Sequence, residues 1–193
     1  MNRTKLALLS LVLGPVLVLT MMTACSDSTL SGNTNVNVYL TDAPIDLTGV
    51  SAVNVTLTGV LLQTAGDANG DSVLLPLTTE GDLVVNLLDY QDGQVLLIAS
   101  GDAPDGDYAR IRLLVSQAEL VRDDDGDPDT AELVEPIFNP SNKVDVPVPF
   151  SLFGGENMEI TLDFDAALSV QVNQTNGQHP YILRPVINVV GMN

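Results

Sequence analysis

The sequence predicts an all-β domain, a single antiparallel β-sandwich, behind an export signal. Apolar residues recur with a period of two in several short runs, which is the pattern of half-buried strands. Clusters of Asp, Gly, Asn and Pro separate these runs, as turns do between strands. No segment keeps a long helical period. Short strands with regular turns are typical of a β-sandwich.

Residues 1–24 have the features of a signal peptide. A basic start is followed by an apolar run from Leu6 to Met22 and by small residues before Cys25. An uncleaved membrane anchor is the alternative, because the run is almost long enough to span a bilayer. Gly14-Pro15 interrupts the run, which favours cleavage.

Cys25 is predicted to carry a lipid anchor. The stretch MTAC resembles the lipobox of bacterial lipoproteins, in which the signal is cut before the cysteine that receives the lipid. Cys25 is the only cysteine, so it has no partner for an internal disulfide. Each buried methylene of an acyl chain adds about 0.8 kcal/mol of membrane affinity. Ser26 follows, and by analogy with lipoprotein sorting it favours the outer membrane, with the domain in the periplasm or at the cell surface.

The mature chain is strongly acidic. Cleavage removes Arg3 and Lys5 and leaves five basic and 25 acidic residues, a formal charge of −20. The remaining basic residues are too few and too scattered to neutralise a phosphate backbone, which excludes nucleic acid as a partner. An aspartate-rich surface suits salty water or the capture of cations.

Residues 25–35 are polar and lack an apolar period, so we expect a flexible tether there and one domain over residues 36–193. NLLDYQ, residues 86–91, is expected to form one turn of helix. The clearest alternating runs are Val36 to Leu40, Val53 to Leu57, Ile111 to Val115 and Val144 to Val148.

Three stretches of the domain resemble one family. VNVYLTDAPID (36–46), GDYARIRLLV (106–115), and ITLDFDAALSV with YILRPVINVV (160–170 and 181–190) are similar to the landmarks of the domain of unknown function 4382. The resemblance implies a secreted β-sandwich, transthyretin-like or immunoglobulin-like. It implies no established activity and no catalytic residue.

The pair Asp163 and Asp165 lies in the alternating stretch EITLDFDAALSV. Ile160, Leu162, Phe164 and Leu168 share the parity expected to face the core, so the two aspartates are expected to face outward. Residues two apart on a strand lie about 6.5–7 Å apart. That is near the separation of the carboxylates in inverting glycosidases, which makes a glycoside hydrolase the alternative function.

A structural role for the two aspartates competes with catalysis. Arg110 and Arg112 have the same two-residue spacing on another expected strand, and ion pairs with Asp163 or Asp165 would keep the carboxylates ionised and define strand register. Simple solvation of the pair is the other structural interpretation. Asp42, in the turn LTDAPID, is expected to bond nearby backbone amides, with a ligand-contacting loop as its functional alternative.

Two aspartate-rich loops raise the question of calcium. Asp123, Asp125 and Asp127, with Asp129 beyond them, reproduce the alternating oxygen spacing of a calcium loop, as do Asp67, Asn69 and Asp71 more weakly. Both loops lack the glycine at the sixth position and the glutamate at the twelfth. The sequence therefore leaves open a weak Ca²⁺ site at 123–129 and a solvated acidic turn.

The sequence contains no motif typical of the active site of a hydrolase, a kinase or a redox enzyme. His179 lies in a polar turn without a matching nucleophile, and there is no glycine-rich phosphate loop. We therefore expect a lipid-anchored, non-enzymatic binding or structural module of the cell envelope. Its ligand is an envelope protein or a glycan, and the lack of tryptophan counts against the glycan.

Overall fold

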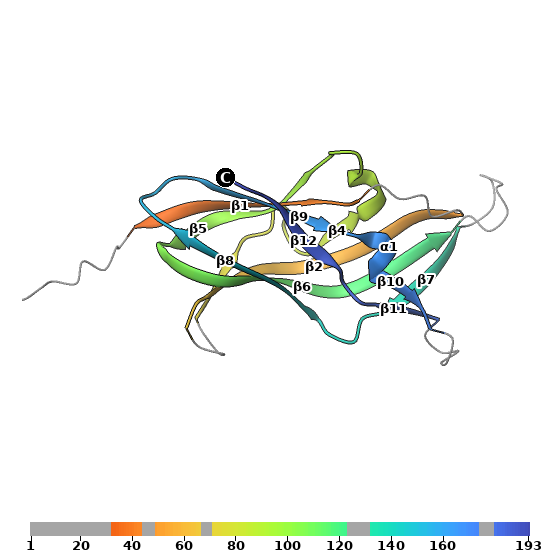
Figure 1. Ribbon diagram of the computed structural model, residues 1–193. Coiled ribbons are helices and arrows are strands. Elements are labelled where there is room, and N and C mark those ends of the chain that lie inside the picture. Colours follow the sequence, from red (N-terminus) through yellow and green to blue (C-terminus); the bar gives the residue numbers. More distant parts are fainter. Residues whose placement is uncertain (1–31, 44–48, 67–70, 123–131, 174–179) are drawn as a thin grey trace, which may run out of the picture.

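The computed structural model describes residues 32–43, 49–66, 71–122, 132–173 and 180–193 (Figure 1). These residues form two β-sheets that pack into a sandwich, which confirms the predicted all-β class. The smaller sheet has four strands, in the order β12 (Ile187–Met192), β9 (Met158–Phe164), β1 (Asn33–Thr41) and β5 (Leu96–Pro104).

The larger sheet has eight strands. Its main path runs through β10 (Val170–Val172), β11 (Tyr181–Leu183), β7 (Leu133–Phe138), β6 (Gly106–Arg122), β2 (Val50–Thr64) and β3 (Ser72–Leu75). Off this path, β4 (Leu83–Asn86) pairs with β2 and β8 (Lys143–Leu152) pairs with β6. The long strands β2 and β6 pair from Val50 and Arg122 to Thr64 and Tyr108. They are the two longest strands in the described part of the chain.

The sheets are mixed, so the prediction of a wholly antiparallel sandwich is wrong in two places. β1 runs parallel to β9, and β7 runs parallel to β11. The remaining strand pairs are antiparallel. An alternating apolar pattern specifies which side of a strand is buried, and it carries no information on the direction of the neighbouring strand.

The core positions predicted from the four clearest alternating runs are confirmed. Side chains of the alternating runs lie between the sheets, and only Val148 among them is half-buried. Tyr108 lies in this core, where its ring stacks on Phe150 with centroids 5.1 Å apart. Its hydroxyl donates a 2.8 Å hydrogen bond to the carbonyl of Pro104, four residues upstream. This is the arrangement of a tyrosine corner, and it anchors the turn between β5 and β6.

One side of the sandwich is closed by contacts between the two sheets. Leu77, after β3, forms a bridge with Ala99 on β5, and the N–H of Ser100 donates to the carbonyl of Pro76 at 3.1 Å. Gly101 permits this approach, because a Cβ there would lie 2.8 Å from Cδ of Pro76. A larger residue at this position would push the two sheets apart.

Three boundaries refine the sequence-based expectations. β1 begins at Asn33, so the last residues of the expected tether belong to the sheet. The expected helical turn is confirmed as the 3₁₀ helix η1 (Leu87–Tyr90). β9 ends at Phe164 and is followed by the short helix α1 (Ala166–Ser169), so Leu168 is exposed and its predicted place in the core is wrong.

Several predicted features lie outside the described residues. These are the signal peptide, Cys25, the tether up to residue 31, His179, the aspartates of the loop 123–129, and Asp67 and Asn69 of the other loop. None of the helices in the described ranges has the length and apolar content that crossing a membrane requires.

Candidate functional site

Asp42 lies at the junction of three elements. It follows β1, its side chain is 3% exposed, and its backbone N–H donates to the carbonyl of Tyr90 in η1. Its Oδ1 accepts a 2.8 Å hydrogen bond from the N–H of Ala166 in α1, and its Oδ2 accepts one of 3.1 Å from Nε2 of Gln91. The amides of residues 44–48, which belong to the expected turn, lie outside the described residues. Asp42 holds together segments that are distant in sequence.

The carboxyl group of Asp42 is hard to ionise. Burial raises its pKa, and the negative charges of Asp163 and Asp165 act in the same direction. The hydrogen bonds from Ala166 and Gln91 oppose the shift without cancelling it. The junction therefore places the buried carboxyl group of Asp42 close to the charges of Asp163 and Asp165.

Asp165 and Asp163 have different roles, although both come from the DFD stretch. Asp165 is the N-cap of α1, and its Oδ1 accepts a 2.8 Å hydrogen bond from the N–H of Leu168. Asp163 pairs in register with Asn188 of β12, and its buried Oδ1 has no hydrogen-bond partner among the described residues. Burial and the charge of Asp165 raise the pKa of Asp163, and a hydrogen bond from the Ala43 N–H partly offsets this.

The arginines expected to pair with these aspartates lie elsewhere. Arg112 makes a bidentate contact with Asp145 of β8, with Nη2 to Oδ2 at 2.8 Å, and Arg110 reaches the same Oδ2 at 3.3 Å. The predicted pairing of Arg110 and Arg112 with Asp163 or Asp165 is therefore wrong. The hydrogen bond from Arg112 lowers the pKa of Asp145, and the same bond raises that of Arg112.

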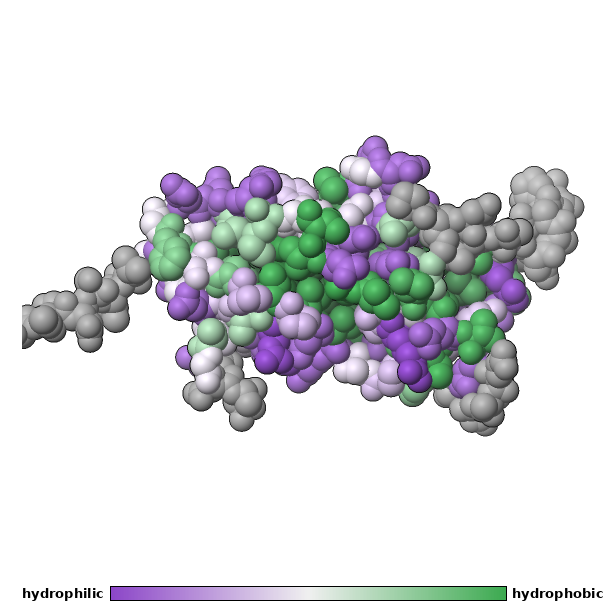
Figure 2. Space-filling view, in the orientation of Figure 1, coloured by the Kyte–Doolittle hydropathy of each residue, from purple (hydrophilic) through white to green (hydrophobic). Residues whose placement is uncertain are grey.

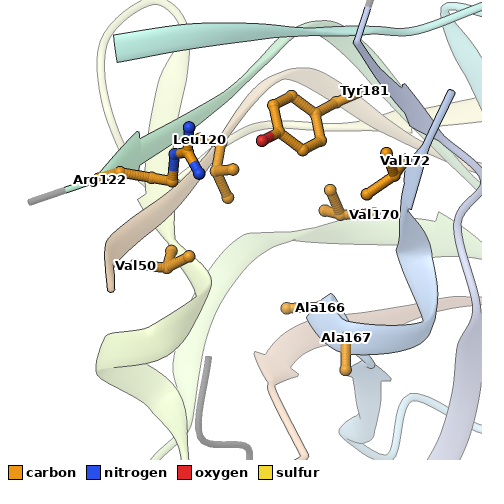
Figure 3. Close-up of a pocket in the computed structure, with 8 residues that line it drawn as sticks. All are labelled: Val50, Leu120, Arg122, Ala166, Ala167, Val170, Val172 and Tyr181. Carbon is orange, nitrogen blue, oxygen red and sulfur yellow. The ribbon is translucent and has the colours of Figure 1, made fainter. Parts of the chain in front are cut away.

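A mostly apolar pocket lies at the end of the sandwich that carries α1, β10 and β11 (Figure 3). We call it the open-end pocket. It has a volume of about 180 Å³, and its walls come from β2, β6, α1, β10 and β11. Among the described residues it is lined by Val50, Leu120, Arg122, Ala166, Ala167, Val170, Val172 and Tyr181.

Arg122 and Tyr181 supply the polar atoms of the open-end pocket. In Figure 3 the hydroxyl of Tyr181 points toward the guanidinium group of Arg122. Nε of Arg122 lies 3.0 Å from Oε2 of Glu135 on β7, although its N–H is not aimed at that oxygen, so the contact is an ion pair and not a hydrogen bond. At this end of the pocket the charge of Arg122 is balanced by Glu135, and the guanidinium group and the Tyr181 hydroxyl are both hydrogen-bond donors.

Large apolar side chains on α1, β7 and β10, at the same end of the sandwich as this pocket, are exposed (Figure 1). Val172 is 68% exposed, Leu168 58% and Leu133 41%. Val172 pairs in register with Tyr181, and Leu133 pairs with Arg122, so both belong to strands whose neighbours line the pocket. We call Leu133, Leu168 and Val172 the open-end surface. Figure 2 shows hydrophobic residues along the middle of the visible face and at the end that carries β7, β10 and β11.

A second pocket of about 160 Å³ lies near the C-terminus. It is lined by Thr34, Ser151, Leu152, Phe153, Glu156, Asn157, Met158 and Asn193. Asp163 and Asp165 line neither pocket. In the described part of the chain, no group of three or more His, Cys, Asp or Glu side chains has the arrangement that holds a metal ion.

Sequence reasoning singled out the carboxylates and missed the open-end pocket. Val170 and Tyr181 belong to stretches that the sequence analysis singled out, but the alternation does not show that the opposite sheet leaves them partly uncovered. Arg122 offered the one signal, because it is among the few basic residues of an acidic chain.

The extent of the fold agrees with a family comparison. The model of the family described as "Domain of unknown function (DUF4382)" matches residues 33–185. The chain belongs to the DUF4382 family. The match begins at Asn33, the first residue of β1, and includes all residues that line the open-end pocket. The resemblance read from the sequence is thereby confirmed.

Comparisons with other proteins add little about the DUF4382 domain. No curated protein matches the sequence. A solved structure, MbnP from Methylosinus trichosporium, resembles it distantly, with 13% sequence identity and a TM-score of 0.28. The similar region covers 68% of this chain and 76% of MbnP. A likeness of this degree carries no argument about function.

Proposed function

We propose that this protein is a lipid-anchored, non-enzymatic binding module of the cell envelope, and that its ligand is another envelope protein. The lipid at Cys25 holds the domain at a membrane, the outer membrane by the identity of Ser26. The tether lets the sandwich reach a partner near that membrane. The open-end surface makes the contact.

The observation that supports this proposal is the exposure of the open-end surface. Val172 lines a mostly apolar pocket and is exposed, and Leu168 of α1 and Leu133 of β7 are exposed at the same end of the sandwich (Figure 1). Single exposed apolar residues are ordinary, but a group of them around a concave site marks interaction surfaces. Burying one such side chain contributes about 1.5–3 kcal/mol, which gives the free end of the sandwich a driving force for association.

A protein ligand fits this surface better than a glycan. Sugar rings stack on exposed aromatic side chains, and the chain has no tryptophan and four tyrosines. One of these, Tyr108, is buried in the core. Aliphatic side chains such as Val172 and Leu168 pack against apolar protein surfaces instead.

The alternative, a glycoside hydrolase that uses Asp163 and Asp165, has one observation in its favour. The raised pKa of Asp163 is what a general acid requires. Asp165, however, is engaged as the cap of α1, and neither carboxylate lines the open-end pocket. Asp163→Asn tests this alternative: sugar released from envelope glycans by the wild type but not by the variant would support the hydrolase, whereas no release by either protein, with equal capture of the partner, supports the binding module.

The proposal is tested by capture from envelope extracts with the mature lipoprotein in nanodiscs. Val172→Ser should recover much less of any specifically bound envelope protein than the wild type. Val84→Ser is the matched control, because Val84 is also a strand valine, is 62% exposed, and lies on β4 away from the pocket. It should capture as much as the wild type.

Equal recovery with the wild type, Val172→Ser and Val84→Ser would show that the open-end surface is not the contact. A glycan array tests the competing hypothesis that the ligand is a carbohydrate. Saturable binding of one class of glycan that persists in Val172→Ser would replace the protein ligand with a carbohydrate.

A further inference from the structure

We propose that the open-end pocket holds one large, uncharged apolar side chain of the partner, taken from an extended segment whose flanking residues are basic. This inference rests on the proposed function, because it specifies what the partner protein presents. It follows from the size of the pocket, the character of its polar end and the charge of the chain.

The volume of the pocket fits a single side chain. Cavities of about 150 Å³ lined by aliphatic side chains bind benzene, whereas sites for drug-sized ligands have about 300–1,000 Å³. At about 180 Å³, the open-end pocket accommodates one Phe, Leu or Met side chain. The walls of Val50, Leu120, Val170 and Val172 match such a group in shape and polarity.

The polar end of the pocket selects an uncharged acceptor. Arg122 and Tyr181 line the pocket, and we assign the Nη atoms of Arg122 and the hydroxyl of Tyr181 as the donors to the ligand. Arg122 alone would favour a carboxylate. Glu135, 3.0 Å from Nε, already neutralises the guanidinium, so a second carboxylate would be desolvated beside a negative charge. A backbone carbonyl of the inserted residue accepts from these donors without that penalty.

The charge of the chain specifies the residues around the inserted side chain. With a formal charge of −20 after removal of the signal, the domain attracts cations and repels acidic segments at moderate ionic strength. Lysine or arginine residues on either side of the anchor therefore speed association and disfavour acidic competitors. An extended segment keeps the anchor side chain and its carbonyl accessible at the same time.

The experiment measures fluorescence polarisation of labelled, amide-capped pentapeptides against the mature lipoprotein in nanodiscs. One peptide has a central phenylalanine between two lysines on each side, and its control has alanine at the centre. The phenylalanine peptide should bind about tenfold more tightly or better, since burying that ring is worth at least that factor. A third peptide, with glutamates in place of the lysines, should bind more weakly than the first, and added salt should narrow this difference.

One variant and its matched control test whether the side chain enters this pocket, and a third variant tests the polar end. Ala167→Leu fills the pocket and should abolish the preference for phenylalanine, while Ala109→Leu, at a half-buried alanine that lines neither pocket, should leave the preference intact. Tyr181→Phe removes only the hydroxyl and should weaken binding of both peptides several-fold. A thermal melt of each variant establishes that it is folded.

Equal affinity for the phenylalanine and alanine peptides in the wild type would overturn the inference. So would a preference that survives in Ala167→Leu. Either result leaves the proposed function standing if Val172→Ser still loses its partner. Loss of the proposed function would instead be seen as unchanged capture by Val172→Ser, whatever the peptides do.

Discussion

The carboxylate of Asp42 accepts a 2.8 Å hydrogen bond from the N–H of Ala166, 124 positions later in the sequence. The bond ties the end of β1 to the first residue of α1. Ala166 and Ala167 in turn form one wall of the open-end pocket. A buried acidic residue therefore positions the helix that shapes the candidate binding site, although Asp42 does not line the pocket itself.

Removing this acceptor should destabilise the domain. Asp42→Ala leaves the buried N–H of Ala166 without its partner, and we expect a loss of about 1–3 kcal/mol in the free energy of unfolding. Asp42→Asn keeps one oxygen for that N–H and should lose less. Urea unfolding followed by circular dichroism measures both values. An unchanged midpoint in Asp42→Ala would show that the bond adds nothing to stability.

The raised pKa of Asp42 predicts the sign of a pH effect. A carboxyl group with a higher pKa in the folded state favours folding fully below its unfolded pKa of about 3.9, where both states are protonated. That contribution is lost as the pH rises through the folded-state pKa. The stability of the wild type relative to Asp42→Asn should therefore fall as the pH rises above about 3.9. A difference that rises over this range would contradict the assignment.

Asp145 should show the opposite dependence on pH and a small effect. Its pKa is lowered by Arg112, so its contribution is present above about pH 3.9 and disappears as the pH falls through the folded-state value. The Asp145 side chain is more than a third exposed, and exposed ion pairs contribute about 0–1 kcal/mol. A double-mutant cycle of Arg112→Gln and Asp145→Asn, measured at low and high salt, tests both the size and the screening.

Lipidation at Cys25 predicts how the protein fractionates. Cys25→Ser should abolish labelling with a palmitate analogue and release the protein from membranes, because one acyl-bearing cysteine is the expected anchor. Ser26→Asp, which leaves Cys25 intact, serves as the control and should retain the label. Continued membrane association of the unlabelled Cys25→Ser protein would identify the uncleaved apolar run as the anchor.

The calcium hypothesis for the loop 123–129 predicts a weak, specific stabilisation. Five aspartates in seven residues repel one another, and a hard cation bound by Asp123, Asp125, Asp127 and Asp129 would relieve that repulsion. We expect dissociation constants of about 10⁻⁴–10⁻³ M, as in extracellular modules. Thermal melts should rise with calcium, and Asp125→Asn with Asp127→Asn should remove the rise. Melts independent of calcium up to tens of millimolar would leave a solvated acidic turn.

The sequence by itself determined the fold class and most of the core. The alternation of Val36, Val38 and Leu40, repeated along β2, β6 and β8, specifies which side of each strand is buried, because successive side chains of a strand point to opposite faces. The same local reasoning identified the turn of helix at η1. Periodicity is a property of neighbouring residues, so a single sequence displays it.

Only the tertiary structure decided how these strands meet and where a site forms. Three interactions join residues that are far apart in the chain. They are the parallel pairing of β1 with β9, the ion pair of Arg112 with Asp145, and the hydrogen bond from Ala166 to Asp42. Two strands with the same pattern bury the same face in either direction, and a charged residue accepts any suitably placed partner. The open-end pocket arises because the facing elements leave Val172 and Tyr181 partly uncovered, which depends on how the two sheets are arranged and not on the residues alone.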